Sequence, residues 1–127
     1  MTLIFCIDDG GGMLFGGKRQ SRDRVLNQYL LSRIGDAPLW VTPYSATLFP
    51  TGRSMETCDG EGYAFIEDGP YRLSQAEEVI LCRWNRRYPG DVFFDEPTLK
   101  AYFKKIATEE LAGSSHPKIT VETYRRK

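Results

Sequence analysis

The chain has 127 residues, of which 41% are hydrophobic and 27% are charged, and its 17 basic and 17 acidic residues cancel to a net charge of zero. These proportions are typical of a globular domain, so we expect one domain over residues 1–127 and exclude an intrinsically disordered chain. The zero net charge gives no overall field that would attract nucleic acid or an anionic membrane, although a local basic patch can still do so.

The three cysteines are an odd number and show no Cys-x-x-Cys spacing. Cys6 and Cys82 lie in apolar runs, where a free thiol behaves as a small core residue. No apolar run approaches the roughly 20 residues that a membrane span needs, and Asp8 and Asp9 come too early for a secretory signal. We therefore expect a reduced, cytoplasmic protein with no membrane partner.

The predicted elements alternate between strands and helices. Residues 3–7 are nearly all apolar, which predicts a buried strand that ends in a glycine-rich loop over residues 10–17. Apolar residues recur at helical spacing in 22–34, with Ser21 as the predicted N-cap and Gly35 as the stop. Further strands are predicted at 39–42, 63–66 and 78–84, with an extended piece at 91–94. Short helical turns are predicted at 44–49, before residue 75 and at 99–104, and a loop is predicted at 50–62.

The chain is predicted to finish as a hairpin. Residues 105–110 and 118–124 flank the turn-rich stretch 112–117, and residues 119–122 alternate between apolar and polar side chains. Strands that alternate with helices favour a parallel sheet. The sequence therefore predicts an α/β domain with few helices and a mostly parallel central sheet that has an antiparallel C-terminal hairpin.

Four stretches, in order along the chain, resemble dihydrofolate reductase. Gly12 and Met13 after the first strand are similar to the family's glycine–methionine loop, which closes over substrate. Asp23 lies in the first turn of the first helix, where the family has its catalytic acid. Further similarity covers residues 63–71 (a strand and double-glycine segment), 78–81 (a late strand), 90–94 (a Gly-Asp-x-x-Phe loop) and 115–126 (the terminal hairpin). The resemblance implies a dihydrofolate reductase-like three-layer sandwich.

The family's cofactor apparatus is mostly missing from this sequence. Its Gly-Arg-x-Thr motif, which seats the cofactor phosphates, corresponds to residues 43–46, where Ser45 stands in a segment without arginine. Its double glycine corresponds to Asp68 and Gly69, next to Glu67, and two carboxylates beside a phosphate site repel the anion. The chain is also shorter than the family around residues 50–62, where the family builds the strand and loop for the cofactor's adenosine end.

Asp23 is the candidate catalytic residue. A buried carboxylate with a raised pKa can hold a pterin ring or relay a proton, and Cys82 stands where the family has a threonine behind its acid. An aspartate two residues after Ser21 is equally what a helix dipole favours. We favour this structural interpretation.

Other polar motifs have two interpretations each. Asp8 and Asp9 lack a third ligand for Mg²⁺, so we interpret them as turn residues and predict no metal site. His116, the single histidine, could form a Ser-His-Asp triad, but Ser114 and Ser115 are its neighbours in a turn and such neighbours rarely give attack geometry. A turn-capping role is therefore favoured for His116.

Two basic clusters could meet phosphate, an acidic partner or nucleic acid. The first, with Arg19, Arg22 and Arg24, leads into the predicted helix, and residues 83–88 interleave arginines with Trp84 and a tyrosine. For the first cluster we favour a solvated entrance to the helix. For the second we favour arginines that lie over their aromatic neighbours. With no net charge, nucleic acid is not the expected partner.

Three functions remain. The favoured one is a scaffold that has lost NADPH-dependent reduction, needs no cofactor, and binds a small ligand or a protein partner. A sheet edge left uncovered would make a homodimer the natural protein complex. The second is an NAD(P)H- or flavin-dependent reductase of a pterin-like molecule, with Asp23 as the acid in the floor of a deep pocket. The third is a nucleic-acid-binding module. An apolar patch near residues 50–62 would favour the scaffold.

Overall fold

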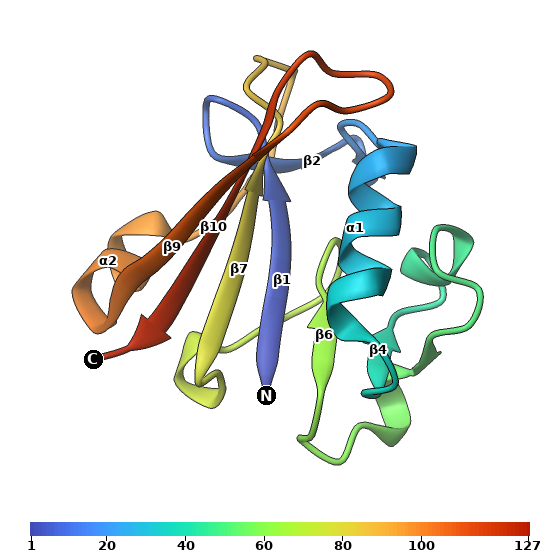
Figure 1. Cartoon of the computed structure of the whole chain (residues 1–127). Helices are drawn as coiled ribbons and strands as arrows, with labels where there is room; N and C mark the ends of the chain where they lie inside the picture. Colours follow the sequence, from blue (N-terminus) through green and yellow to red (C-terminus); the bar gives the residue numbers. More distant parts are fainter.

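The computed structural model describes all 127 residues and has a seven-stranded sheet at its centre. Its strands are β1 (Thr2–Ile7), β4 (Leu39–Val41), β5 (Arg53–Ser54), β6 (Tyr63–Phe65), β7 (Glu78–Arg83), β9 (Phe103–Leu111) and β10 (Ile119–Arg126). In the order β5-β4-β6-β1-β7-β10-β9, the first five strands are parallel, and the β9–β10 hairpin joins β7 antiparallel (Figure 1). The predicted α/β class and sheet arrangement are confirmed.

Two helices and a small second sheet complete the chain. The helices are α1 (Arg24–Ile34) and α2 (Glu96–Tyr102), and three single 3-10 turns lie at Ser45–Thr47, Met55–Thr57 and Leu73–Gln75. The second sheet joins β3 (Lys18–Arg19), β2 (Gly12–Phe15) and β8 (Val92–Phe93), with β2 in the middle. The prediction of a loop over residues 10–17 was therefore wrong for residues 12–15, because pairing with two distant segments gives this glycine-flanked stretch a strand conformation.

Helix α1 begins two residues later than predicted, and its N-cap is Asp23 rather than Ser21. Asp23 has an extended backbone (φ −150°, ψ 123°), and its carboxylate accepts hydrogen bonds from the backbone N–H groups of Val25 and Leu26. The first turn of a helix leaves its N–H groups without partners inside the helix, and an aspartate at this position satisfies two of them. Helix α2 starts at Glu96, three residues earlier than predicted, because Asp95 caps it.

The central sheet has a hydrophobic cluster on each face. Alternate strand residues such as Ile4, Phe65 and Cys82 face α1, which contributes Leu26, Leu30 and Ile34. The next residues along the strands face α2, the small sheet and the segment around Tyr71. Each fully buried leucine or isoleucine stabilises the fold by about 1.5–3 kcal/mol relative to its exposed state. The arrangement confirms the predicted three layers (Figure 1).

Strand β9 forms one edge of the central sheet. Its residues from Lys104 to Glu110 are exposed, and charged side chains dominate them, which discourages another strand from pairing there. Neither helix is long and apolar enough to cross a membrane.

Candidate functional site

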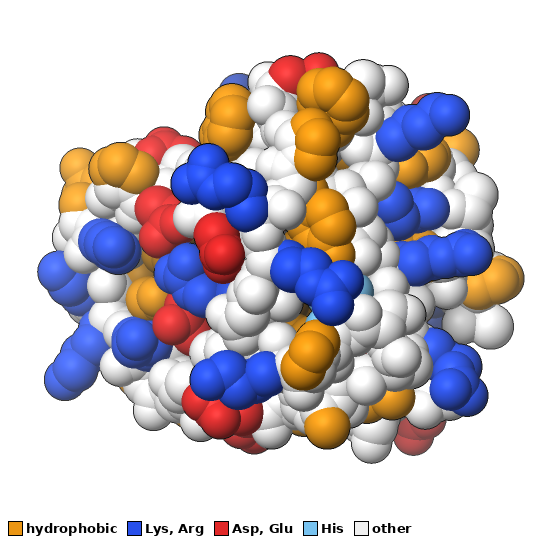
Figure 2. Space-filling view, turned by 90° about the horizontal axis from the view of Figure 1, so that it is seen from above, with side chains coloured by type: hydrophobic (Ala, Val, Ile, Leu, Met, Phe, Trp, Pro, Cys, Tyr) orange, Lys and Arg blue, Asp and Glu red, His pale blue; other side chains and the backbone are white.

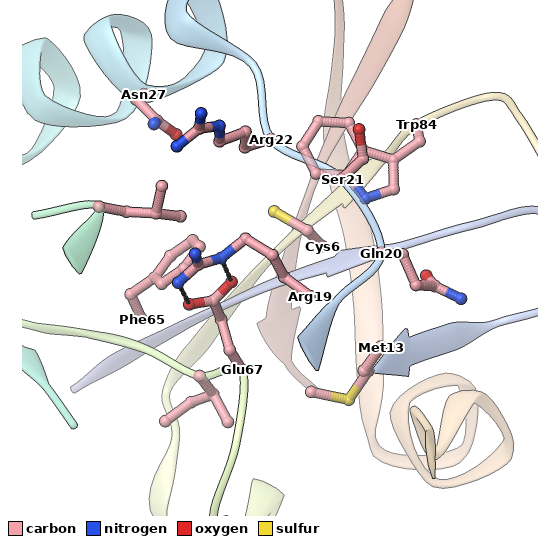
Figure 3. A pocket seen from close by; sticks show the side chains of 12 residues that line it. Cys6, Met13, Arg19, Gln20, Ser21, Arg22, Asn27, Phe65, Glu67 and Trp84 are labelled. Atoms are coloured by element: carbon pink, nitrogen blue, oxygen red, sulfur yellow. Dashed lines mark hydrogen bonds and ion pairs between the residues drawn. The ribbon is translucent and has the colours of Figure 1, made fainter. Parts of the chain in front are cut away.

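A narrow cleft lies at the carboxyl ends of β1 and β6, beside the N-terminus of α1. Its lining includes Cys6, Met13, Arg19, Ser21, Glu67 and Trp84 (Figure 3). In open α/β sheets ligands bind at this end of the parallel strands. The enclosed space in the cleft has room for about one water molecule, so a molecule the size of NADPH does not fit inside it as it stands.

An ion pair between Arg19 and Glu67 crosses the cleft, and Figure 3 shows the two side chains facing one another. Arg19 Nε and Nη2 donate to Glu67 Oε2 and Oε1 at 2.8 and 2.9 Å, and Ser45 Oγ donates to Oε1 at 2.9 Å. The guanidinium also lies 4.2 Å from the centre of the Tyr44 ring. The hydrogen bond to Glu67 raises the pKa of Arg19 above its usual value, and a two-point contact holds the two side chains together.

The residues that correspond to the family's cofactor site lie around this ion pair. Ser45 is fully buried in a 3-10 turn and donates to Glu67. Asp68 accepts a hydrogen bond from Thr42 Oγ1 at 2.6 Å, and Gly69 follows with φ +90°. The carboxylates of Glu67 and Asp68 thus lie where the resemblance puts the cofactor phosphates. Arg19 is already paired with Glu67.

Asp23 is buried, but it does not line the cleft. Its carboxylate faces the loop between β9 and β10, where it accepts hydrogen bonds from the backbone N–H groups of Ser114 and Ser115 at 3.0 and 2.8 Å. Its Oδ2 also lies 2.9 Å from His116 Nδ1. Burial by itself opposes ionisation, but the hydrogen bonds from His116 and from the backbone outweigh it and hold the pKa of Asp23 well below its ordinary value. A pocket with Asp23 in its floor is therefore not present in this structure.

His116 joins this carboxylate to two hydroxyl groups. Its Nε2 lies 3.0 Å from Ser21 Oγ and 3.0 Å from the Tyr88 hydroxyl. The indole of Trp84 stacks on the imidazole with the ring centres 4.6 Å apart. Sequence reasoning identified His116 as a turn residue and considered only the adjacent serines as its partners. The serine that meets Nε2 is 95 residues away, so no local spacing in the sequence could reveal it.

The expected substrate-loop residues are close to the cleft, in different roles. Met13 lines the cleft from β2, and Gly12 is packed so closely against Gln20 that a Cβ there would collide with its amide. Cys82 is fully buried and lies beside Cys6 in the pairing of β7 with β1, so only Cys6 reaches the cleft. A hydrogen bond with Cys82 and burial raise the pKa of the Cys6 thiol well above its usual value, which keeps the thiol protonated.

The acidic pair lies beside the second basic cluster, since the backbone N–H of Asp9 donates to the Arg86 carbonyl oxygen at 2.9 Å. Asp8 accepts hydrogen bonds from the backbone N–H groups of Gly10, Gly12 and Tyr88, as expected of a turn residue. No group of three or more histidine, cysteine, aspartate or glutamate side chains is placed to hold a metal ion. In the second cluster, Arg83 is paired with Glu122 and Glu96.

An apolar groove lies on the face of the central sheet opposite α1. It has a volume of about 510 Å³, and its lining includes Leu3, Met55, Cys58, Ala64, Ile66 and Tyr71, with Arg72 and Gln75 as polar neighbours. Met55 and Cys58 come from residues 50–62, where the resemblance predicted a shortened segment. The sequence analysis named an apolar patch at this place as the feature that would favour a binding scaffold.

No protein-family model and no curated protein matches the sequence. Among solved structures, the chain is similar to dihydrofolate reductase from Enterococcus faecalis complexed with NADP(H) and RAB-propyl, with a TM-score of 0.72. The sequences are 16% identical, and the superposition covers 99% of this chain and 95% of the reductase. Similarity at this level of identity shows the fold alone. The chain therefore has the fold of dihydrofolate reductase, as the colinear motifs predicted.

Proposed function

We propose that this chain is a dihydrofolate reductase-like domain that binds a small, largely apolar ligand and does not carry out NADPH-dependent reduction. The observation that carries the proposal is the contrast between the two sites. The cleft at the carboxyl ends of the strands is closed by the Arg19–Glu67 ion pair, whereas the apolar groove on the opposite face has room for a ligand.

Charge argues against a nicotinamide cofactor in the cleft. A bound pyrophosphate needs cationic or N–H donors, and the resembled family supplies them with an arginine and with close backbone approach at a double glycine. In this chain the side chains of Glu67 and Asp68 lie at that place, and Arg19 is already held at two points by Glu67. A phosphate would have to displace a buried carboxylate, so it would have to overcome both the ion pair and the like charge.

The groove meets the usual requirements of a small-molecule site. Ligand sites enclose about 300–1,000 Å³ and combine an apolar lining with a few polar groups, and the groove of about 510 Å³ is within that range. Aromatic and sulfur-containing side chains, here Tyr71, Met55 and Cys58, adapt well to ligands of irregular shape. Arg72 could pair with an anionic end of the ligand.

A reductase of a pterin-like molecule is the second candidate. The specific observation in its favour is that the similar Enterococcus faecalis structure is complexed with NADP(H). It requires the Arg19–Glu67 pair to open and Asp23 to turn from His116 toward the cleft. The six hydrogen bonds that Asp23 accepts oppose this second movement.

The two tryptophans allow the sites to be tested separately. Trp84 lines the cleft, whereas Trp40 belongs to the core cluster beneath the apolar groove. In Trp40→Phe and Trp84→Phe variants, each remaining indole reports on one side of the sheet. We expect NADPH up to millimolar concentration to leave both signals unchanged apart from its own absorbance. Micromolar NADPH binding seen by Trp84 and confirmed by calorimetry would overturn the proposal.

The groove itself is tested with the apolar anionic dye 1-anilinonaphthalene-8-sulfonate. We expect the folded protein to bind the dye, and Met55→Asp to weaken that binding at least tenfold. The matched control is Phe15→Asp, because Phe15 is an exposed apolar residue on the small sheet, away from the groove. Equal dye binding by both variants would contradict a ligand site in the groove. A sedimentation experiment shows whether a second copy of the chain covers the groove instead.

A further inference from the structure

We propose that Ser21, His116 and Asp23 form a nucleophilic triad that hydrolyses small carboxylic esters bearing an anionic group. The three side chains come from two segments that are far apart in the sequence, and they meet where the β9–β10 loop covers the N-terminus of α1. This activity is separate from ligand binding in the apolar groove, which lies on the other face of the sheet.

The hydrogen-bond pattern fixes the role of the imidazole. Because Asp23 is ionised and surrounded by donors, its Oδ2 can only accept a hydrogen bond from His116. In the neutral imidazole Nδ1 therefore carries the hydrogen, and the lone pair of Nε2 faces both Ser21 Oγ and the Tyr88 hydroxyl, each at 3.0 Å. This is the order of contacts in which a histidine removes a proton from a serine while an aspartate holds the ring.

The surroundings of Ser21 favour negative charge. Its backbone N–H and those of Arg22 and Asp23 donate to no other group of the protein, and the N-terminus of α1 follows directly. In serine hydrolases the N–H group of the residue after the nucleophile is a common part of the oxyanion site. The Tyr88 hydroxyl, 3.4 Å from Ser21 Oγ, is a further donor within reach of a developing oxyanion.

A basic groove lies next to the cleft that Ser21 lines, and its charge indicates the class of substrate. It has a volume of about 630 Å³ and is lined by Arg22, Arg24, Ser114 and Ser115, among others. Arg22, Asn27 and Leu48 line both the groove and the narrow cleft, so the groove adjoins the cleft that contains Ser21, and an ester would reach the serine from the groove. In Figure 2 the right-hand side of this end of the molecule shows Lys and Arg side chains with few acidic ones. An ester with a carboxylate or phosphate group fits this charge.

The reaction proceeds in two balanced halves. Ser21 Oγ bonds to the ester carbonyl carbon while its proton passes to His116 Nε2, and the carbonyl electron pair moves to the oxygen. The bond from that carbon to the alcohol oxygen then breaks, and the alcohol leaves with the proton from His116. Water repeats the sequence on the acyl-serine, releases the acid and restores Ser21. No oxidant or reductant is needed.

The test uses a fluorophosphonate probe and two aryl esters, p-nitrophenyl acetate and the singly charged p-nitrophenyl succinate. We expect mass spectrometry to find the phosphonate on Ser21 and the succinate ester to be hydrolysed faster than the acetate. Ser21→Ala should abolish the label and lower ester hydrolysis about 100-fold or more. Ser54→Ala is the matched control, since Ser54 is an exposed serine in β5.

Further variants separate a catalytic from a structural role. Arg22→Gln should reduce kcat/KM for the succinate ester more than for the acetate ester, and added salt should act in the same way. His116→Gln should slow phosphonate labelling of Ser21 about 100-fold or more. If His116→Gln does not fold, the result for Ser21→Ala decides, because that change removes only a half-buried hydroxyl. A wild-type protein without phosphonate label or esterase activity, or an activity unaffected by Ser21→Ala, overturns the proposal.

Discussion

The Asp23 carboxylate joins two distant parts of the chain, so its removal should destabilise the protein strongly. Asp23→Ala removes the N-cap of α1, which costs about 1 kcal/mol. It also leaves the buried N–H donor of His116 and the partly buried N–H donor of Ser115 without acceptors, at about 1–3 kcal/mol for each group. These losses come to about 3–7 kcal/mol, a large share of the roughly 5–15 kcal/mol that stabilise a typical domain.

Urea unfolding followed by tryptophan fluorescence measures this loss. With an m value of about 2 kcal/mol/M, the unfolding midpoint of Asp23→Ala should fall by about 1.5–3.5 M. Asp23→Asn should cost about 2 kcal/mol, because its amide still caps the helix but presents hydrogens to His116. The control is Asp36→Ala, since Asp36 is an exposed aspartate just beyond α1. A loss below about 1 kcal/mol for Asp23→Ala would refute the account of the network.

Three further predictions concern the same end of the molecule. Glu67→Ala should lower the free energy of unfolding by about 2 kcal/mol, because it leaves Arg19 largely buried and without its carboxylate partner. The double variant Arg19→Met, Glu67→Leu should cost less, and equal costs in urea unfolding would show that the two side chains do not stabilise one another. Folding lowers the pKa of Asp23, so the stability that this group contributes is complete above its unfolded pKa of about 3.9 and is lost as the pH falls further. In Asp23→Asn the free energy of unfolding should therefore depend less on pH below about pH 4. Gly113→Ala should lower stability by about 2 kcal/mol, since its Cβ would collide with Asp23 and lie 2.8 Å from His116 O; unchanged thermal unfolding would contradict that packing.

Strong local patterns predicted most of the fold. The apolar runs that became β1 and β7 are buried on both faces, so their composition alone indicates central strands. The period-two alternation of residues 119–122 likewise indicated β10. Errors arose where local signals compete. Ser21 and Asp23 are both good N-cap residues, and only the loop that packs on Asp23 decides between them.

The candidate sites were less visible in the sequence. Glycines on both sides of residues 12–15 indicated a loop, and only the pairing with β3 and β8 makes this stretch a strand. The contact between His116 and Ser21 depends on how the hairpin lies across α1, which no residue spacing encodes. The start of α2 was readable, because Asp95, Glu96 and Pro97 form a helix-entry pattern that apolar spacing alone overlooked.

The anchoring of α1 by the β9–β10 loop also sets an order for folding. Backbone groups 91 and 92 residues further along the chain hold the N-cap aspartate, so the helix cannot gain these contacts during synthesis until the hairpin has left the ribosome. Contacts of such long range close late and slow the folding of small domains. Nascent chains stalled before Ser114 should therefore have a first helix that proteases cleave readily, and resistance should appear only when the hairpin emerges.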